Sequence, residues 1–164
     1  MFEEYKSRIL DREGTRFPSH SYQEIVLQPA YDEAKRNFLH SLIHIHIDHL
    51  KMLEDQQLIS KDVAKKIGWA IGQLDLNYFE NQGYDPQFED LFFRIEHKLM
   101  ELAGDVAGNL HIGRSRNDMG IAIYRMTIRK KLLSLMKECL TLRTSLLAFA
   151  KEHIDTIMLG HTHT

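Results

Sequence analysis

Several features that would indicate a particular class of protein are scarce in this chain of 164 residues. A single cysteine, Cys139, excludes an internal disulfide, and its place in an apolar helical pattern predicts a small core residue in a reducing compartment. The net charge is −2, which gives no electrostatic argument for binding nucleic acid or an acidic membrane. Apolar runs of about 18 residues, which a membrane span needs, are absent. The polar first ten residues do not resemble a signal peptide, so we expect a cytoplasmic protein.

Only three prolines interrupt the chain, and apolar residues recur at helical steps of three and four over much of its length. The pattern predicts three helices: one over 29–54, one over 60–76, and a third marked by Leu91, Ile95, Leu99 and Leu102, with Glu89 and Asp90 in its first turn. Pro29 suits a first helical turn, Ser60 suits an N-cap, and Gly104 suits a helix stop. Residues 1–28 have no sustained period and predict an irregular lead-in, and residues 77–86 predict a turn-rich connection.

The longest apolar pattern follows Asp118 and predicts a helix over 118–153. Such a helix would be about 50 Å long, at about 1.5 Å per residue, which exceeds the diameter of a domain of this size. Leu133, Met136 and Leu147 widen its apolar stripe beyond a two-stranded seam. We therefore expect several partner helices, within the chain or from other copies in a homo-oligomer.

Three histidines, His44, His46 and His49, are close enough on a helix to raise the possibility of a metal site. No carboxylate-rich motif accompanies them, and His46 lies about half a turn away from His44. We expect partly buried or solvent-facing histidines and no bound metal.

The richest chemistry lies in HIGRSRND, residues His111–Asp118, just before the predicted long helix. Arg114 and Arg116 alternate with Ser115 and Asn117 beside a helix N-terminus, where free N–H groups and the helix dipole favour anions. Guanidinium groups also contact carboxylates in a planar, bidentate manner. These residues predict a receptor for carboxylate or phosphate.

Two alternatives remain open for this segment. Asn117 or Asp118 can act only as a cap in a solvated polar loop. One of the arginines, Arg114 or Arg116, can hold the loop through Asp118 or through an acidic helix end instead of facing a ligand.

This octapeptide resembles the HTGRSRND segment of the argininosuccinate lyases, members of the fumarase/aspartase superfamily. Two other segments match that family in the same order: EDLFFRIE resembles EDIHxxxE, and LGHTHT resembles PGYTHLQ. The resemblance implies an all-α fold. A small N-terminal helical lyase domain, residues 1–112, would be followed by the first long helix of a central helical bundle in residues 113–164.

The resemblance also implies a carbon–nitrogen lyase that eliminates fumarate from argininosuccinate to give arginine, with a small dicarboxylate substrate and no cofactor. His163 would be catalytic in proton transfer, a task that suits the imidazole pKa. The substrate would be bound by Arg114, Ser115, Arg116, Asn117 and Thr162. Glu89, Asp90, His111 and Asp118 would support the site.

Nothing in the sequence resembles the family's serine-bearing loop GSSxMPxKxNP, which supplies the catalytic base. The resemblance therefore implies an N-terminal portion that is inactive alone, and a homotetramer in the intact protein with each active site shared by three subunits.

The sequence also departs from the family's motifs. Phe92 replaces a histidine, and Met119 and Gly120 replace glutamine and valine. These changes keep open a paralogue that acts on another N-substituted aspartate. A non-catalytic helical assembly module is a third interpretation.

Overall fold

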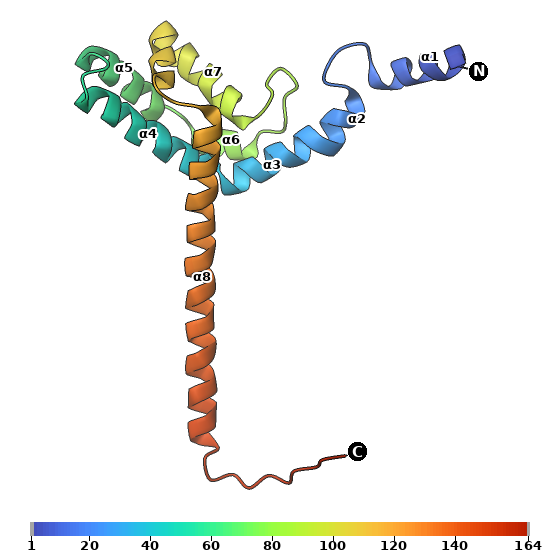
Figure 1. Cartoon of the computed structure of the whole chain (residues 1–164), viewed down its shortest axis with the longest axis vertical. Coiled ribbons are helices and arrows are strands. Elements are labelled where there is room, and N and C mark those ends of the chain that lie inside the picture. Colours follow the sequence, from blue (N-terminus) through green and yellow to red (C-terminus); the bar gives the residue numbers. More distant parts are fainter. Residues whose placement is uncertain (1, 164) are drawn as a thin grey trace. The chain divides into compact units, whose positions relative to one another are not determined.

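The predicted all-α fold is confirmed. A computed structural model describes residues 2–163, and over that range the chain forms helices and turns but no strand (Figure 1). It divides into two compact units, Met1–Thr127 and Ile128–Thr164. The predicted domain boundary between residues 112 and 113 stays a prediction.

The helical elements follow one another with short connections. In chain order they are α1 Phe2–Glu13, α2 His20–Tyr22, a π-helical segment Gln23–Leu27, α3 Gln28–Asn37, α4 Leu39–Asp55, α5 Lys61–Gly72, α6 Leu76–Asn81, α7 Leu91–Ala103, a 3-10 segment Gly104–His111, and α8 Arg116–Glu152.

The expectation of one helix over 29–54 is wrong, because the chain breaks at Phe38 between α3 and α4. The carbonyl of Asn37 accepts a hydrogen bond from the hydroxyl of Thr127 at 3.1 Å. The Phe38 ring packs edge-on against Tyr124, with 5.1 Å between ring centroids. Both partners lie on α8, so the break depends on tertiary contacts that the local pattern does not show.

The two segments expected to be irregular also contain helix. The lead-in forms α1, whose acidic first turn and basic Arg12 near its end suit the helix dipole, but α1 buries none of its side chains. The stretch expected to be a connection begins with α6. There the carboxylate of Asp75 accepts a hydrogen bond from the Tyr78 N–H at 3.2 Å, and Phe79 is buried.

The remaining predicted boundaries agree closely with the structure. The Ser60 hydroxyl caps α5 by accepting a hydrogen bond from the Val63 N–H at 3.3 Å, although α5 ends at Gly72 rather than near 76. Gly104 ends α7 with φ of 69°, as expected, but Asp90 caps α7, so the expectation that Glu89 and Asp90 lie in its first turn is wrong. The long helix is confirmed as α8.

The core of the first unit lies among α4, α5, α7 and the 3-10 segment, which pack on one another. Its most deeply buried aliphatic side chains are Leu39, Leu53, Ile67, Ile95 and Leu99. This core supports the segment that leads into α8.

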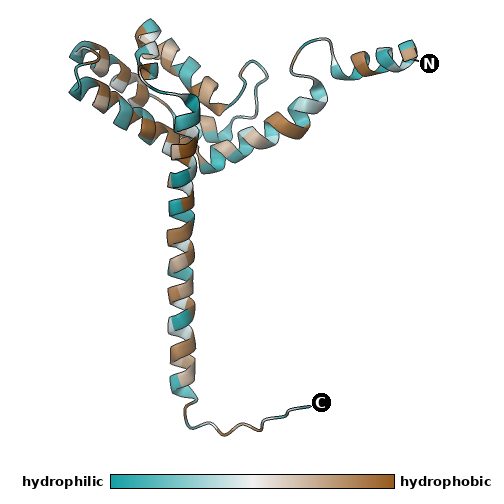
Figure 2. Ribbon diagram, in the orientation of Figure 1, coloured by the Kyte–Doolittle hydropathy of each residue, from teal (hydrophilic) through white to brown (hydrophobic). Residues whose placement is uncertain are grey.

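The second unit contains the rest of α8 and the irregular segment after Glu152. Apolar residues recur along α8 (Figure 2), and in this unit their side chains are exposed. Cys139 is exposed as well, so the expectation of a core cysteine is wrong. No helix among residues 2–163 is long and apolar enough to cross a membrane.

Replacing Ile95, which is fully buried on α7, by alanine should lower the free energy of unfolding by about 2–5 kcal/mol, because a cavity forms in the core. The matched change Ile47→Ala, on a side chain that is 46% exposed, should cost well under half as much. Urea unfolding followed by circular dichroism measures both, and equal losses would contradict the position of the core.

Candidate functional site

The candidate site is built where a short loop, residues 112–115, enters α8. Gly113 has φ of 65°, a left-handed conformation that favours glycine and turns the chain into the helix. The Ser115 hydroxyl then accepts a hydrogen bond from the Asn117 N–H at 3.2 Å, so Ser115 caps α8. The alternative in which Asn117 or Asp118 is the cap is therefore wrong. Ser115, Asn117 and Asp118 are exposed at the helix start.

Arg116 ties the start of α8 to the start of α7. Its guanidinium pairs with Glu89 at 3.3 Å and forms a second ion pair with Asp90, the residue that caps α7. The guanidinium carbon also lies 4.8 Å from the centroid of the Phe93 ring. Pairing with an acidic helix end, one of the contacts left open for the arginines, is thus seen for Arg116, and whether Arg116 also faces a ligand stays a prediction. Its side chain is still 44% exposed.

Arg114 turns into the protein instead of outward. Its side chain is only 5% exposed. Nη1 donates a hydrogen bond to Nδ1 of His46 on α4 at 3.0 Å, and Nη2 lies 3.7 Å from the carboxylate of Glu96 on α7. The loop guanidinium therefore joins two core helices.

His46 is neutral in this arrangement. Burial, and next the nearby Arg114 guanidinium, lower its pKa to about 3. Because a guanidinium can only donate, Nδ1 of His46 must be the acceptor and the ring proton must sit on Nε2. That Nε2 atom is buried without a hydrogen-bond partner.

Glu96 has the opposite shift. Burial raises its pKa to about 7, although Arg114 acts to lower it. Nε2 of His111 lies 2.8 Å from Oε1 of Glu96. The contact is not aligned as a hydrogen bond, since Oε1 has no hydrogen-bond partner. Glu96 is thus a mostly buried carboxyl, with 15% of its side chain exposed, whose charge changes near neutral pH.

The structure does not bring all of the predicted site residues to one surface. Ser115 and Asn117 face solvent, whereas Arg114 is buried. Thr162 and His163 are exposed in the second unit, after the end of α8. Their role beside Ser115 and Asn117 stays a prediction.

The sequence did not predict that His46, His49 and Glu96 contact the 112–115 loop and hold it. His49 lies one turn after His46, and its Nε2 lies 3.0 Å from the carbonyl oxygen of Ile112, within hydrogen-bond reach. The signal for Glu96 was present, because it sits between Phe92 and Leu99 on the inward stripe of α7, where a carboxylate needs a partner. The signal for the two histidines was only their spacing.

Across residues 2–163 no group of three or more histidine, cysteine, aspartate and glutamate side chains could hold a metal ion. That no metal or cofactor is needed stays a prediction.

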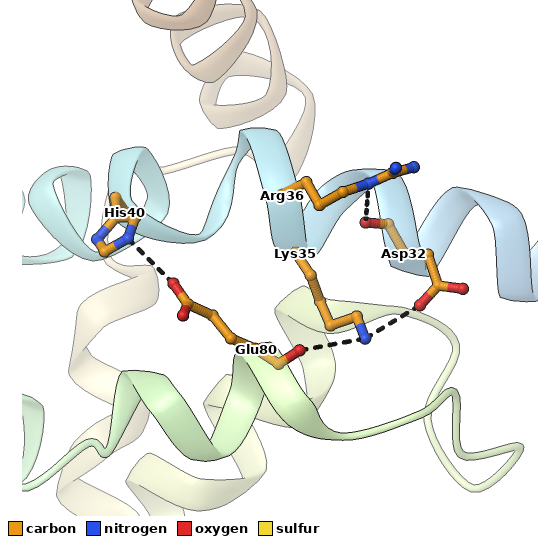
Figure 3. A pocket seen from close by; sticks show the side chains of 5 residues that line it. All are labelled: Asp32, Lys35, Arg36, His40 and Glu80. Atoms are coloured by element: carbon orange, nitrogen blue, oxygen red, sulfur yellow. Dashed lines mark hydrogen bonds and ion pairs between the residues drawn. The ribbon is translucent and has the colours of Figure 1, made fainter.

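A surface hollow of about 570 Å³ lies elsewhere on the first unit, between α3, the start of α4 and α6 (Figure 3). Most of its charged side chains pair with one another. Lys35 pairs with Asp32 at 3.0 Å and donates to the carbonyl of Gln82 at 2.6 Å, and His40 lies 3.2 Å from Glu80. Lys35 thus binds carbonyl groups at and just beyond the end of α6, and none of the predicted site residues lines this hollow.

Comparison with known proteins tests the resemblance that the three sequence segments suggested. Residues 55–164 match the profile of a protein family described as lyase. The chain belongs to this lyase family. The resemblance to the argininosuccinate lyases of the fumarase/aspartase superfamily is thereby confirmed at the level of the family.

Individual relatives of this chain carry a more specific name. Argininosuccinate lyase 1 of Shouchella clausii is 33% identical over 147 residues, which cover 89% of this chain and 30% of that protein. The argininosuccinate lyase of Methanococcus maripaludis strain C5 is 36% identical over 132 residues, 80% of this chain and 27% of that protein. Argininosuccinate lyase 2 of Agrobacterium fabrum is 32% identical over 151 residues, 91% of this chain and 30% of that protein. The chain spans about 30% of the length of these curated relatives. No solved structure matches this chain.

The Glu96 carboxyl should make the stability of the lyase chain depend on pH. Its pKa rises from 4.5 to about 7 on folding, so the folded state keeps a proton that the unfolded state releases between these values. Its contribution is fully present below about pH 4.5 and is lost as the pH rises through about 7. Glu96→Gln should therefore gain stability over the natural chain above that range, by about 1–3 kcal/mol, and little below it.

Urea unfolding at a series of pH values tests this difference. His46 acts in the opposite sense, because its folded pKa of about 3 lies below 6.5 and its contribution is lost as the pH falls through that window. His46 is present in both proteins, so its effect cancels. The control Glu101→Gln changes a carboxyl on α7 whose pKa is lowered by Lys98, and it should show no such gain. A pH-independent difference for Glu96→Gln would contradict the burial of a titrating carboxyl.

Proposed function

We propose that this chain carries the carboxylate-binding part of a carbon–nitrogen lyase of the argininosuccinate lyase type, which cleaves argininosuccinate to arginine and fumarate. One observation carries the proposal: in a member of the lyase family, the HIGRSRND loop presents Ser115 and Asn117 to solvent at the N-terminus of a long helix. The cytoplasm is the proposed location.

The chemistry of elimination fits these groups. The reaction removes a weakly acidic proton from carbon, and the electrons collect on the neighbouring carboxylate before the carbon–nitrogen bond breaks. Hydroxyl, carboxamide and free backbone N–H donors at a helix start stabilise that charge. We assign this task to Ser115, Asn117 and the first turn of α8. Thr162 binds substrate and His163 moves a proton in this proposal.

Arg116 is the guanidinium that we assign to the substrate side. It is 44% exposed and already balanced by Glu89 and Asp90 at the start of α7. A substrate carboxylate would compete with these side chains, which hold the guanidinium in place when no substrate is bound. His111 and Asp118 support the loop from either end.

A second candidate, a paralogue acting on another N-substituted aspartate, is favoured by Phe92. Its ring stacks on His46 with 6.3 Å between centroids and lies 5.8 Å from the guanidinium carbon of Arg116. The resemblance places an imidazole at this position. An apolar ring beside the proposed carboxylate site suits a different amine half of the substrate.

We also propose that the protein is a homo-oligomer, a tetramer when intact. The support is the second unit, where a wide stripe of apolar side chains on α8 is exposed, among them Leu132, Leu135, Leu142, Leu146 and Phe149. An apolar stripe of this width on a helix is normally buried against neighbouring elements. The long apolar row supports bundle formation with other copies of the chain.

A protein that carries this chain should release fumarate from argininosuccinate, measured by the ultraviolet absorbance of the conjugated dicarboxylate. Asn117→Leu should lower the rate about 100- to 1000-fold, because a near-isosteric side chain removes only the donor and acceptor groups. His163→Asn should also suppress turnover and leave substrate binding largely intact. The chain of residues 1–164 alone should show no turnover.

The matched control is Asn77→Leu, at an exposed asparagine of α6 away from the loop, which should keep full activity. Activity that survives both Asn117→Leu and His163→Asn would overturn the site assignment. Fumarate release from another N-substituted aspartate but not from argininosuccinate would identify the paralogue. No fumarate from any such substrate would favour a non-catalytic assembly module.

The isolated chain should sediment as an oligomer at micromolar concentrations. Replacing Leu135 and Leu142 together by lysine should shift it toward monomer, because each lysine places a charge on the row that α8 would bury. Lys137→Ala and Lys151→Ala, on the same helix, should leave the oligomer unchanged. A strict monomer of the natural chain in analytical ultracentrifugation would contradict the proposal.

A further inference from the structure

We infer that Arg114 does not contact the substrate but fastens the 112–115 loop to the core, and that His46 and Glu96 are positioning residues that act through it. The inference rests on the proposed function only for what Ser115 and Asn117 bind. The attachment of the loop stands on the contacts themselves.

Two loop residues, one on either side of Gly113, are held by two side chains of one helix. His49 Nε2 lies 3.0 Å from the carbonyl oxygen of Ile112, and Arg114 donates to Nδ1 of His46 at 3.0 Å. His46 and His49 are three residues apart on α4, so they lie on one face. Gly113 sits between the two held residues with its left-handed φ of 65°. The loop is therefore fixed on both sides of its turn.

Burial separates Arg114 from its neighbours in the motif. Its side chain is 5% exposed and its Nη2 atom is inaccessible to solvent, whereas Ser115 and Asn117 are exposed. A ligand that approaches the start of α8 would have to open the loop to reach this guanidinium. A buried guanidinium also needs internal partners, and Glu96 supplies the opposite charge at 3.7 Å.

A histidine suits the place opposite Arg114 because it offers a lone pair on a flat ring. His46 is fully buried, and its ring lies nearly parallel to that of Phe92, with 24° between the planes. Its burial keeps the imidazole neutral, so the lone pair of Nδ1 is available to the guanidinium. A leucine would fill a similar volume without the acceptor. An asparagine would return an oxygen close to the position of Nδ1.

Hydrogen exchange in the chain of residues 1–164 tests the attachment without any substrate. The Asn117 and Met119 N–H groups bond to the side chain and carbonyl of Ser115 at 3.2 Å each. His46→Leu should speed exchange of these two amides about tenfold or more, as the loss of a hydrogen bond to a charged group implies. His46→Asn should restore most of the protection. His44→Leu, at an exposed position of the same helix, should change nothing.

A double-mutant cycle in the fumarate-releasing protein tests the role of Arg114. If Arg114 acts through His46, then Arg114→Met and His46→Leu should lower kcat/KM by similar factors, and the double variant should be no worse than Arg114→Met. If Arg114 binds substrate, the two losses should multiply, and the inference is overturned. Arg114→Met leaves the Glu96 carboxyl without its cation, so the cycle is repeated with Glu96→Gln present in every protein.

A negative result for the loop attachment can be distinguished from a failure of the proposed function. Unchanged exchange at Asn117 and Met119 in a folded His46→Leu chain overturns the attachment and leaves the lyase assignment standing. Faster exchange in a protein that releases no fumarate supports the attachment and counts against the lyase assignment. Circular dichroism confirms folding of each variant.

Discussion

The buried guanidinium of Arg114 is the constraint on which the candidate site depends. A positive charge removed from water requires a nearby carboxylate and acceptors in fixed positions. Glu96 on α7 and His46 on α4 meet that need, and both helices belong to the core of the first unit. The polar loop is therefore held in a fixed position by side chains of two core helices. The raised pKa of Glu96 and the lowered pKa of His46 are the electrostatic cost of this arrangement.

Part of the fold could be predicted because several helices carry clear local patterns. The third predicted helix was found with its stop at Gly104 but not with its cap, and α8 was found to within two residues at either end. The break at Phe38 could not be found, because the contacts that mark it come from Tyr124 and Thr127, more than eighty residues later. The apolar row through Phe38 continues without a local sign of interruption.

The residue types of the candidate site could be predicted from the sequence, but not the direction in which each arginine side chain points. The sequence placed two arginines in one octapeptide, and nothing in their spacing distinguishes one that turns inward from one that stays at the surface. The distinction comes from the partners: Arg116 meets Glu89 and Asp90 at the surface, and Arg114 meets His46 in the interior. Partners on other helices are visible only after the chain has folded. The exposure of Cys139 is a related case, since an apolar helical pattern indicates a face that can be buried but not whether this chain buries it.

The hydrogen bond from the Thr127 hydroxyl to the Asn37 carbonyl, beside the break at Phe38, has a second effect. Together with the ion pairs of Arg116, it holds α8 at two levels, at its first residue and about three turns later. A helix attached at one point can rotate about its axis, whereas attachment at two points to different partners prevents that rotation. One residue of slippage would rotate the helix by about 100° and turn Asn117 away from its present direction. The direction in which the Asn117 carboxamide points is thus fixed by Thr127, which lies on the order of 15 Å further along the helix axis, at about 1.5 Å per residue.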